Sequence, residues 1–548
     1  MYKSATLAIF LLFCNTYIFA QQQAIVKLYD STRKQAPREK LYLHFDKNTY
    51  TNADTIWFKA YLVDATLNIP STTSGLIYTE IIDENNDVVE SLALPTVSGL
   101  SWGALALGEK KFKSGTYTFR AYTNWMQNFG DTYFFQKQFK VFSLTSETEK
   151  AISTTAKTKQ PAIGQVNRAN SDAKNIDLQF LPEGGNLTAG SRQKIGFKAL
   201  NSNGKGILVS GDIMDSQGNV VANFSSNNSG MGTFLLNTVS NEKYSALVKN
   251  MPGVDFKLPA IKELSTTLKV TNDFKSDSLV IELTSALNQP LTIVGQSRGV
   301  ICFVGDLTTK NKTIRVSKSI FPTGVCQVLV LDAQRKALNE RNFFNNLSDV
   351  IKLDITSNKI SYTNRDSVQL LIKANIYDAN PTQMSLSIAV TDDSQVIKDS
   401  ENDANILSYL LLTSDLRGEI QNPGSYFINN DEQTHNNLEA LMLTQGWVNY
   451  EWDLSKKPIF KSEKELTLSG KISNGFNTPI ANAKVTMVGQ NRGFMMIDTI
   501  ANEKGEFVFD KLPMMDSAYF VVQALNTKGK NEFRNKRFDC IITGQCTG

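Results

Sequence analysis

Hydrophobic and polar residues alternate along most of the chain with the period of two that a β-strand produces. In residues 55–63, TIWFKAYLV, every second side chain is apolar. The apolar set is Ile56, Phe58, Ala60 and Leu62, and the intervening residues are Thr55, Trp57, Lys59 and Tyr61. Such alternation predicts a strand with one buried face. Comparable runs occupy residues 115–123, 194–200, 278–285, 367–376 and 506–512.

Clusters of Gly, Asn and Asp separate these runs, as at residues 83–87, 201–204 and 215–219. Short strands joined by such turns are typical of antiparallel sandwiches. We therefore predict a mostly β chain made of tandem antiparallel, immunoglobulin-like β-sandwich domains. The only long helical signals are a lead-in helix within residues 21–37 and two apolar runs within residues 401–460, which we interpret as a helical insertion and return.

One phrase recurs in the chain. YTNADTIWFKA begins at Tyr50, YTNRDSVQLLIKA begins at Tyr362, and a looser copy, LTAGSRQKIGFKA, begins at Leu187. Each copy has a hydrophobic residue, a polar turn and an alternating strand that closes on Lys-Ala. Three copies predict tandem domains of about 90–110 residues, which is the size of one sandwich.

Composition limits the function. The chain has 548 residues, 41% hydrophobic and 20% charged, which is enough for several globular domains. A net charge of +4 gives no support to nucleic-acid binding. The only two histidines are His44 and His435, so His-based metal catalysis and a His-centred triad are disfavoured.

The N-terminus has the pattern of a signal peptide over residues 1–20. Lys3 precedes an apolar run at residues 7–13, and Ala20 precedes three glutamines. The run is too short to span a membrane, and no later segment reaches that length. We expect an exported protein in the periplasm or associated with the outer membrane, with no transmembrane segment in the mature chain.

The cysteines leave two alternatives open. Cys302 and Cys326 lie in strand-like segments, so they could form a disulfide in an oxidising compartment if their strands are neighbours. Two buried free thiols are the alternative, which strand composition slightly favours. Cys540 and Cys546 lie in a segment without strand alternation, residues 531–548, for which we expect an irregular tail.

Several segments together resemble a known family. EKLYLHFDKNTYTNADTIWFKAYLVD (39–64) and SGTYTFRAYTNWMQNF (114–129) resemble the second macroglobulin-type domain, MG2, of the alpha-2-macroglobulin superfamily. They look most like a group of large exported bacterial proteins built on that domain. Residues 178–206, 321–344 and 384–396 resemble parts of further macroglobulin domains. The resemblance implies such domains at residues 38–145, 175–262, 263–347 and, in part, 348–400, with a linker at residues 146–174.

Residues 463–530 resemble a carboxypeptidase regulatory-like domain, a transthyretin-like sandwich without peptidase chemistry, on the segments LSGKISNGFNTPIANAKVTMVGQ and ANEKGEFVFDKLP. The bacterial group often continues into a plug-like domain of TonB-dependent receptors, which is apparently absent here. We expect either a truncated member or a natural short form. The repeated turn also departs from the family, which has Gly where Ala53 and Arg365 stand, so we expect that position to avoid positive φ.

The sequence motifs of known catalytic, cofactor and metal sites are not found in this chain, so we predict no catalytic residue, cofactor or metal. The chain lacks the Gly-Cys-Gly-Glu-Gln motif of thioester macroglobulins and the His-Glu spacings of zinc peptidases. PEGGNLTAG (182–190) is expected to be a turn at the start of a sandwich, because no Lys-Ser/Thr and no helix follow it. His44 lies in a strand segment and is expected to be structural.

The sequence therefore favours a non-enzymatic binding scaffold that acts through protein–protein contact. The resemblance implies an outer-membrane transporter or a protease as partner. The alternatives are an endopeptidase inhibitor that captures proteases sterically through an exposed bait segment at residues 396–440, and a hydrolase with a carboxylate pair that no motif singles out. Tyr122, Trp125 and Phe129 either contact a partner or, as we favour, close their own sandwich.

Overall fold

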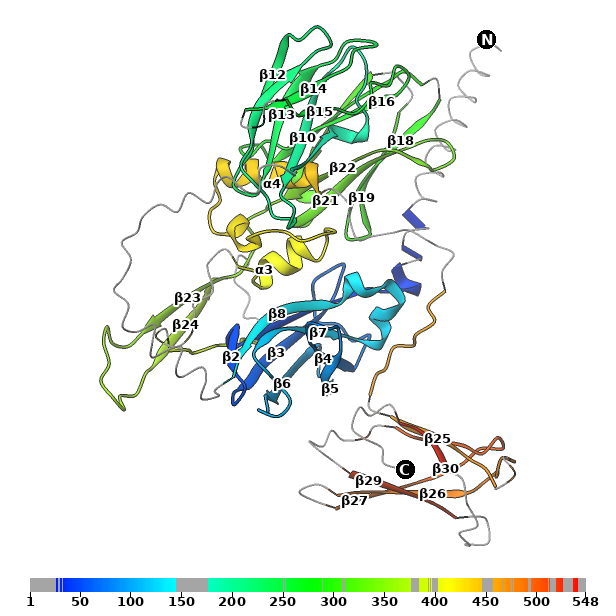
Figure 1. Cartoon of the computed structure of the whole chain (residues 1–548). Helices are drawn as coiled ribbons and strands as arrows, with labels where there is room; N and C mark the ends of the chain where they lie inside the picture. Colours follow the sequence, from blue (N-terminus) through cyan, green and yellow to red (C-terminus); the bar gives the residue numbers. More distant parts are fainter. Residues whose placement is uncertain are drawn as a thin grey trace, which may run out of the picture. The chain divides into compact units, whose positions relative to one another are not determined.

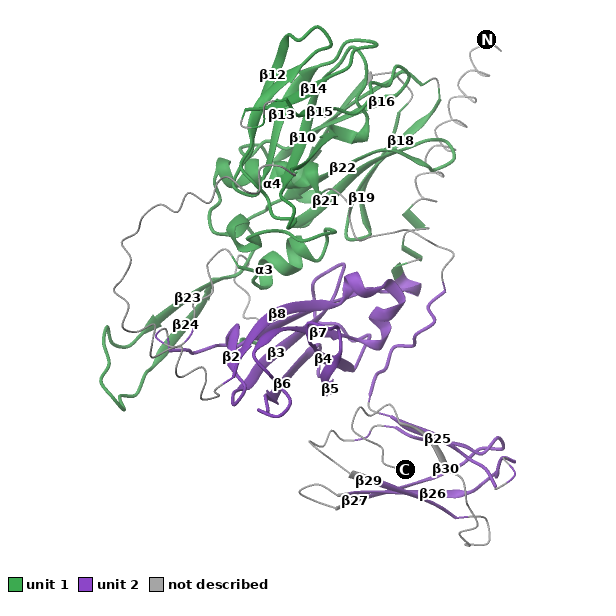
Figure 2. Ribbon diagram, in the orientation of Figure 1, with its two compact units in different colours: residues 1–33, 163–387, 400–451 green, residues 34–162, 388–399, 452–548 purple. Residues whose placement is uncertain are grey.

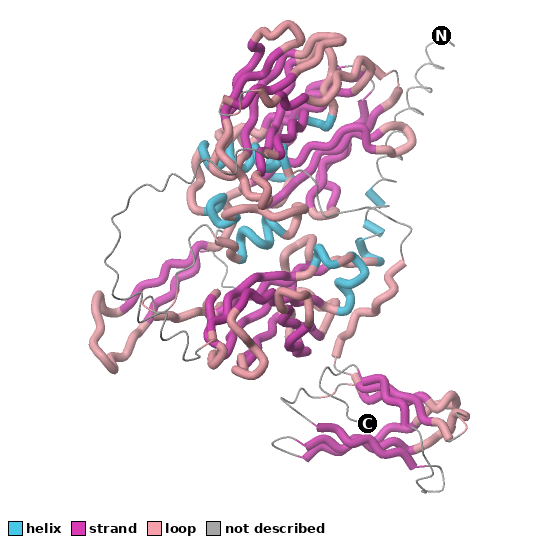
Figure 3. Tube along the Cα trace, viewed as in Figure 1, coloured by secondary structure: helices cyan, strands magenta, loops and turns pink. Residues whose placement is uncertain are grey.

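The computed structural model is mostly β, with antiparallel sheets along the chain, as the alternation predicts (Figures 1 and 3). It describes residues from 26 to 540 with gaps, of which the longer are 144–175, 376–383, 397–402, 446–456, 513–518 and 526–535. The predicted linker at 146–174 falls wholly outside the described residues. The predicted lead-in helix is described only in part, and residues 26, 27, 30, 31 and 33–35 are helical.

The chain divides into two compact units (Figure 2). Unit 1 comprises residues 1–33, 163–387 and 400–451, and unit 2 comprises residues 34–162, 388–399 and 452–548. Each unit contains more than one β-domain. Among the described residues, no helix combines the length and apolar character needed to cross a bilayer.

The first sandwich of unit 2 has two sheets. One has the order β1 (Glu39–Phe45), β3 (Thr55–Asp64), β6 (Leu100–Ala106). The other has the order β2 (Thr49–Thr51), β8 (Phe135–Phe142), β7 (Gly115–Tyr122), β4 (Leu76–Ile82), β5 (Val88–Pro95). The alternating residues of β3 meet the prediction, because Ile56, Phe58, Ala60 and Leu62 are all at most 5% exposed. Two 3₁₀ turns, η1 (Asn124–Phe129) and η2 (Asp131–Tyr133), connect β7 to β8.

The first sandwich of unit 1 pairs a three-stranded and a four-stranded sheet. The strands are β9 (Asp177–Pro182), β10 (Arg192–Leu200), β11 (Ser210–Met214), β12 (Val220–Ser225), β13 (Met231–Asn237), β14 (Ser245–Val248) and β15 (Asp255–Lys257), in the orders β13-β10-β9 and β12-β11-β14-β15. Its core is aromatic, because the rings of Phe180, Phe197, Phe224 and Phe234 contact one another with centroids 5.1–6.3 Å apart.

The second sandwich of unit 1 repeats this arrangement. Its strands are β16 (Thr266–Thr271), β17 (Ser278–Ser285), β18 (Leu291–Ser297), β19 (Val300–Leu307), β20 (Asn311–Ser317), β21 (Gly324–Leu331) and β22 (Ala337–Asn345), in the orders β16-β17-β20 and β19-β18-β21-β22. A 3₁₀ turn, η4 (Lys318–Ile320), precedes β21. Every residue of β21 is buried, and Phe321 and Phe343 pack edge to face at 5.2 Å in the core.

The helical insertion belongs to unit 1. It contains α3 (Ile406–Ser408), the π-helical turn η5 (Tyr409–Thr413), the 3₁₀ turn η6 (Pro423–Phe427) and α4 (Glu432–Thr444). Asp431 caps α4, because its side chain accepts a hydrogen bond from the Thr434 amide at 2.8 Å. Leu412, Tyr426 and Leu441 join Met231 and Phe344 of the two sandwiches in one buried cluster. The insertion therefore shares a core with both sandwiches of its unit.

The part of unit 1 after residue 347 differs from the sandwiches. β23 (Lys352–Ser357) and β24 (Leu370–Asn375) form a two-stranded antiparallel sheet. Every residue of β23 is exposed, and β24 is only partly covered at Ile372 and Ala374.

The last β-domain of unit 2 has two three-stranded sheets. Its strands are β25 (Leu468–Ile472), β26 (Lys484–Gln490), β27 (Phe494–Ile500), β28 (Glu506–Phe509), β29 (Tyr519–Leu525) and β30 (Lys536–Cys540), in the orders β28-β25-β30 and β27-β26-β29. The expectation of an irregular tail from residue 531 is wrong for β30. β30 pairs with β25 along Lys536–Cys540, because backbone groups at the free edge of β25 bind a strand without regard to its side-chain pattern.

The repeated phrase makes the same hydrogen bonds to its turn aspartate at both of its close copies. Asp54 accepts hydrogen bonds from the Thr51 amide at 2.7 Å and Lys47 Nζ at 2.8 Å. Asp366 accepts from the Thr363 amide at 3.0 Å and from Lys359 Nζ at 3.3 Å. The two copies therefore share a hydrogen-bond pattern as well as a sequence.

The expectation that this turn avoids positive φ is wrong at Arg365. Its φ is 69°, whereas Ala53 has no positive φ and Gly190, in the looser copy, has φ 64°. The left-handed conformation strains a residue that has a Cβ atom by about 1 kcal/mol. The hydrogen bonds to Asp366 hold the turn closed in spite of that strain.

Candidate functional site

Two tryptophans lie exposed on the outer face of the sheet β1-β3-β6. Trp57 is 58% exposed and Trp102 is 71% exposed. In the register between β3 and β6, Trp57 pairs with Ala104 and Trp102 with Lys59, so the two indoles are diagonal neighbours on one face. We call the surface formed by Trp57, Lys59, Tyr61 and Trp102 the aromatic face.

A cation lies at the centre of the aromatic face. Lys59 Nζ is 5.3 Å from the centroid of the Tyr61 ring, and the Tyr61 ring lies 6.5 Å from that of Tyr42. The opposite side of the sheet is buried in the sandwich, since Phe58 packs over Gly103. The sandwich core thus holds the strands that present the indoles to solvent. Exposed Trp and Tyr on a rigid element are the residues that most often anchor protein–protein interfaces.

The sequence contains a signal for this surface, although the predicted contact residues, Tyr122, Trp125 and Phe129, do not belong to it. Trp57 is on the polar side of the alternation in residues 55–63, where a strand in water normally carries small or charged side chains. A large aromatic residue at such a position is exposed whenever the strand has one buried face. Trp102 could not be found in this way, because its neighbours in residues 100–106 do not alternate cleanly.

The structure places the three predicted partner residues together, at the end of β7 and in η1. Trp125 is 9% exposed, its Nε1 donates a hydrogen bond to the Pro37 carbonyl, and its ring packs against Phe129 at 6.0 Å. Tyr122 stacks on Phe134 at 4.5 Å and donates to Glu80 at 2.9 Å. Burial and the Glu80 carboxylate raise the pKa of Tyr122 to about 12. These contacts lie within one domain, and contact with a partner stays a prediction.

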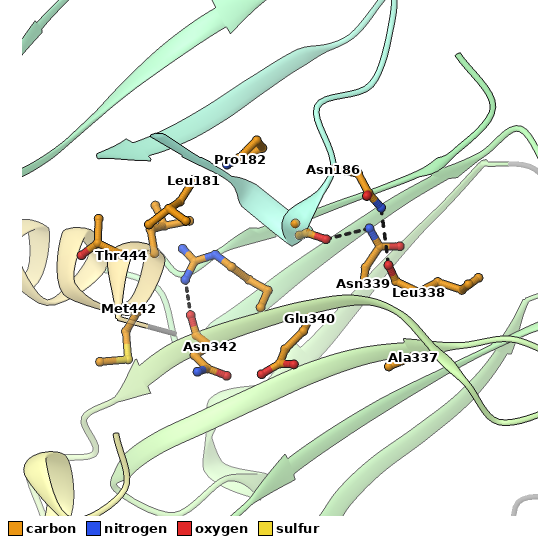
Figure 4. Close-up of a pocket in the computed structure, with 14 residues that line it drawn as sticks. Leu181, Pro182, Asn186, Ala337, Leu338, Asn339, Glu340, Asn342, Met442 and Thr444 are labelled. Carbon is orange, nitrogen blue, oxygen red and sulfur yellow. Dashed lines mark hydrogen bonds between the residues drawn. The ribbon is translucent and has the colours of Figure 1, made fainter. Parts of the chain in front are cut away.

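A pocket of about 400 Å³ lies in unit 1, where β9, β22 and α4 meet (Figure 4). Its walls come from three stretches of chain, at residues 181–186, 337–342 and 442–444. The PEGGN segment supplies the first wall as the turn η3 (Glu183–Gly185), which begins where β9 ends. The prediction of a turn at this position in the chain is confirmed.

A buried arginine joins the three walls. Arg341, on β22, donates from Nε to Glu183 Oε1 at 2.9 Å and from Nη2 to Glu439 Oε2 at 2.7 Å. Its side chain is 2% exposed, as against 3% for Glu183 and 11% for Glu439. Burial alone would lower the pKa of Arg341, but the two carboxylates outweigh burial and raise it. Arg341 therefore stays charged and ties the turn η3 and helix α4 to the second sandwich.

The turn η3 also fits closely against that sandwich. Gly184 has φ 75°, and a Cβ atom at this position would lie 3.0 Å from the Leu268 carbonyl oxygen. Asn339, labelled in Figure 4, donates from Nδ2 to the Gly184 carbonyl at 2.9 Å. It also donates to the Thr266 carbonyl at 3.0 Å. The glycine is thus required both by the backbone conformation and by the space available.

The pocket offers little for acid–base chemistry. Arg341 engages both Glu183 and Glu439, so neither is free to act as the proton donor of a carboxylate pair. Burial raises the pKa of Glu340, which also lines the pocket, and the Gln327 amide donates a hydrogen bond to it. A single perturbed carboxyl group does not make a hydrolytic site.

The remaining candidates have structural contacts. His435 lies on α4, and its Nε2 is 2.6 Å from the Asn272 carbonyl oxygen. In the part of the chain that the structure describes, no three His, Cys, Asp or Glu side chains gather as metal ligands would.

Cys302 is partly buried and Cys326 is buried, and both are free thiols. Burial raises the pKa of Cys302 to about 11 and that of Cys326 to about 12. Free thiols and a disulfide in an oxidising compartment remain the two alternatives, of which the sequence slightly favours the first.

Comparison with known proteins gives solved structures but no family assignment. No family model and no curated protein matches the chain. It is similar to the alpha-2-macroglobulin of Salmonella reacted with methylamine, at 11% identity and a TM-score of 0.17, over 91% of this chain and 39% of that one. It is also similar to the Escherichia coli alpha-2-macroglobulin activated by porcine elastase, at 11% identity and a TM-score of 0.21, over 91% and 43%.

A third similar structure is the dimeric latent PorU of Porphyromonas gingivalis, at 11% identity and a TM-score of 0.24, over 56% of this chain and 34% of that one. The chain thus spans about two fifths of the length of the two macroglobulins and a third of PorU. TM-scores this low do not establish a shared arrangement of domains.

Proposed function

We propose that the protein is a non-enzymatic, exported binding scaffold of macroglobulin type, which acts by protein–protein contact in the periplasm or at the outer membrane. The observation that carries the proposal is the aromatic face, where Trp57 and Trp102 are 58% and 71% exposed on a strand pair fixed by the sandwich core. The MG2-like motifs at residues 39–64 and 114–129 belong to the same domain and support the macroglobulin type.

The chemistry of the aromatic face indicates the kind of partner. Two indoles and a tyrosine offer apolar area, and Lys59 adds a positive charge between them. A protein segment that combines aliphatic side chains with a carboxylate would bury the rings and pair with the ammonium group. We propose an outer-membrane transporter as the protein that supplies this segment, in keeping with the group that the chain resembles.

Steric capture of a protease has less support. A bait segment has to be extended and accessible, whereas residues 405–440 within the expected bait are mostly helical and include the buried Leu412, Tyr426 and Leu438. The expectation of an exposed segment is therefore wrong for these buried residues, whereas residues 417–419 and 428–433 are exposed. The hydrolase alternative also has little support, because Glu340 is the one carboxylate that lines the pocket and Arg341 engages the two others near it, Glu183 and Glu439.

The test is an in-cell crosslink and pull-down of the exported protein, with partners identified by mass spectrometry. The variant Trp57→Ala/Trp102→Ala is compared with Leu264→Ala, which removes a side chain that is 77% exposed elsewhere. We expect the double variant to lose the partner that the unchanged protein and the control both recover. Each indole should change the dissociation constant by about 30-fold, in line with an interface hot spot of about 2 kcal/mol.

Three results would count against the proposal. Recovery of the same partners by the double variant would remove the aromatic face as the contact. Recovery of proteases together with a cut inside residues 396–440 would favour steric capture. Hydrolysis of a peptide or glycan panel that is lost in Glu340→Gln would revive an enzymatic function.

A further inference from the structure

Residues 459–464, which lead into the last β-domain of unit 2, lie against the first sandwich of the same unit. They form neither helix nor strand, and we call them the strap. The residues of the sandwich that hold the strap by hydrogen bonds are called the seat, and they are Gly75, Tyr78, Asn124 and Asn128. The sandwich thus binds a segment that is distant from it in the sequence.

One half of the seat recognises the main chain of the strap. Asn128 Oδ1 accepts hydrogen bonds from the Ile459 amide at 2.7 Å and the Phe460 amide at 2.8 Å, and its Nδ2 donates to the Phe460 carbonyl at 2.8 Å. Asn124 Nδ2 donates to the Lys461 carbonyl at 3.1 Å. The side chains of Ile459 and Phe460 are 86% and 38% exposed. These contacts therefore depend on peptide groups, which almost any sequence supplies.

The other half of the seat recognises a carboxylate. The Tyr78 hydroxyl donates to Glu463 Oε2 at 2.7 Å, and the Gly75 amide donates to the Glu463 carbonyl at 2.6 Å. Burial and, after it, the hydrogen bond to Glu463 raise the pKa of Tyr78, so the hydroxyl keeps the proton that it donates. A hydrogen bond to an ionised acceptor is stronger than one between neutral groups. The seat thus favours an acidic residue three positions after the second amide that Asn128 binds.

A buried carboxylate holds both halves of the seat in place. Glu39, on β1, is 1% exposed. It accepts hydrogen bonds from the hydroxyls of Ser71 at 2.6 Å, Ser74 at 2.7 Å and Thr123 at 2.9 Å. Ser74 directly precedes Gly75, and Thr123 caps η1, which carries both asparagines. None of these bonds involves the strap, so the sandwich preorganises the seat by itself.

Gly75 makes room for the strap. A Cβ atom at this position would collide with the main chain of Lys464, and the three atoms nearest to it all belong to Lys464. Gly75 does not have a positive φ, so its backbone conformation does not require glycine. The close approach of the strap is therefore the physical reason for a glycine here.

We propose that the seat is a peptide-binding site for an acidic segment of a partner protein, and that the strap is the occupant which the chain itself supplies. The contacts need peptide groups and one carboxylate at a fixed spacing, so a segment in trans can make all of them. The strap buries no large apolar side chain in the seat, so hydrogen bonds alone hold it and it can exchange.

The strap competes with any such partner segment. A segment tethered by a short linker has an effective concentration in the millimolar range, so the partner binds only as the strap leaves. The seat contains no residue of the aromatic face, and this inference does not rest on the contact proposed there. Trp57→Ala/Trp102→Ala should therefore leave both results below unchanged.

The first test determines whether the strap occupies the seat. Gly75→Ala should displace the strap, and Gly108→Ala is the matched control, because a Cβ atom at Gly108 in the same domain would meet nothing within 4 Å. Trypsin should cut after Lys461 and Lys464 at least about tenfold faster in Gly75→Ala than in the control. Mass spectrometry of timed digests measures the ratio. Equal rates in the two variants would overturn the proposal.

The second test determines whether the seat binds a peptide in trans. The full chain carries Ile459→Pro/Phe460→Pro/Glu463→Ala, which removes from the strap the two amides and the carboxylate that the seat binds. The probe is a synthetic peptide with the sequence of residues 457–465, followed by saturation-transfer NMR. We expect a Kd of about 1 mM for this strap variant. Binding to the unchanged protein should be at least about tenfold weaker, because the tethered strap competes.

Two controls make the binding specific. Asn128→Leu, added to the strap variant, should abolish binding, because leucine keeps the volume of the side chain and removes its amide. A peptide with glutamine in place of Glu463 should bind at least about threefold more weakly. The proposal would be overturned if the strap variant bound no peptide, if the unchanged protein bound it equally well, or if neither control weakened binding.

Discussion

At the scale of single residues, the carboxylate of Asp54 in the repeated turn makes the stability of the first sandwich of unit 2 sensitive to pH. Burial alone would raise the pKa of Asp54, but the hydrogen bonds from Lys47 and the Thr51 amide outweigh burial and hold that pKa below its usual value. A group whose pKa is lower in the folded state stabilises the fold above its unfolded pKa of about 3.9. The contribution disappears as the pH falls through the lowered folded-state value.

We therefore expect Asp54→Asn to lower the free energy of unfolding of the first sandwich of unit 2 by about 1 kcal/mol at pH 7, the net contribution of a typical intramolecular hydrogen bond. Between pH 4 and pH 2 the unchanged protein should lose this advantage. Urea unfolding of both proteins at pH 7 and at pH 2 measures the difference. Glu109→Gln, at an exposed site, is the control and should have little effect at either pH. A deficit of the same size at low pH would contradict the assignment.

Residue identity alone predicted part of this behaviour. The repeated phrase shows that Asp54 and Asp366 are equivalent, and the structure gives both the same amide and lysine donors. The φ of Arg365 could not be predicted from its identity, because arginine disfavours the left-handed region that the turn imposes. The sequence places Trp57 on the polar side of its strand. Its exposure follows only once the structure shows that the other face of the sheet is the covered one.

At the scale of elements, the buried ion pairs of Arg341 hold three segments together. β22, η3 and α4 contribute one side chain each, and the partners are separated by 158 and 98 residues in sequence. The alternating pattern predicts where strands form, but it gives no information about which charged residue meets which across domains. The pocket therefore could not be located from the sequence, although its PEGGN turn could.

We expect Arg341→Met to destabilise unit 1 by about 3–5 kcal/mol, because it leaves the buried Glu183 without its arginine and Glu439 with only Lys194, whose Nζ is 3.9 Å away. Replacing all three residues, as in Arg341→Met/Glu183→Leu/Glu439→Leu, should recover most of that loss. Thermal unfolding followed by circular dichroism measures both changes.

The surface pair of Lys269 and Glu282 provides the control for this prediction. Their side chains are 50% and 41% exposed, and Lys269→Met should change the stability by less than about 1 kcal/mol. If Arg341→Met and Lys269→Met had equal effects, the buried ion pairs would not be what joins these elements.

At the scale of the whole molecule, accessibility to proteases distinguishes a scaffold from a trap. Arg417 is the one trypsin site within residues 405–444, and it is exposed. Its backbone is held from outside the loop, because Gln445 Nε2 donates to the Arg417 carbonyl at 3.2 Å and to the Glu419 carbonyl at 3.1 Å. A protease needs about ten residues of extended chain, so cleavage requires this region to open locally.

We expect trypsin to cut slowly after Arg417 in the unchanged protein and at least about tenfold faster in Gln445→Ala, which frees the loop by about the free energy of one or two hydrogen bonds. Mass spectrometry of timed digests measures the ratio. Lys205→Ala is a control that removes only the exposed ion pair to Glu419 and should leave the rate nearly unchanged. Rapid cleavage after Arg417 in the unchanged protein, with trypsin retained, would instead support capture.

The position of Glu439 also bears on the order in which the chain can fold. Domains form roughly in the order of synthesis, and both sandwiches of unit 1 are complete in sequence by residue 345. Arg341 can pair with Glu183 at that stage, but Glu439 follows Arg341 by 98 residues in the sequence. Until α4 docks, a nascent chain presents an arginine with one of its two counter-ions and the uncovered apolar residues Met231, Val325 and Phe344. Unit 1 therefore has an obligatory late step, and this intermediate is the form that a chaperone would have reason to recognise.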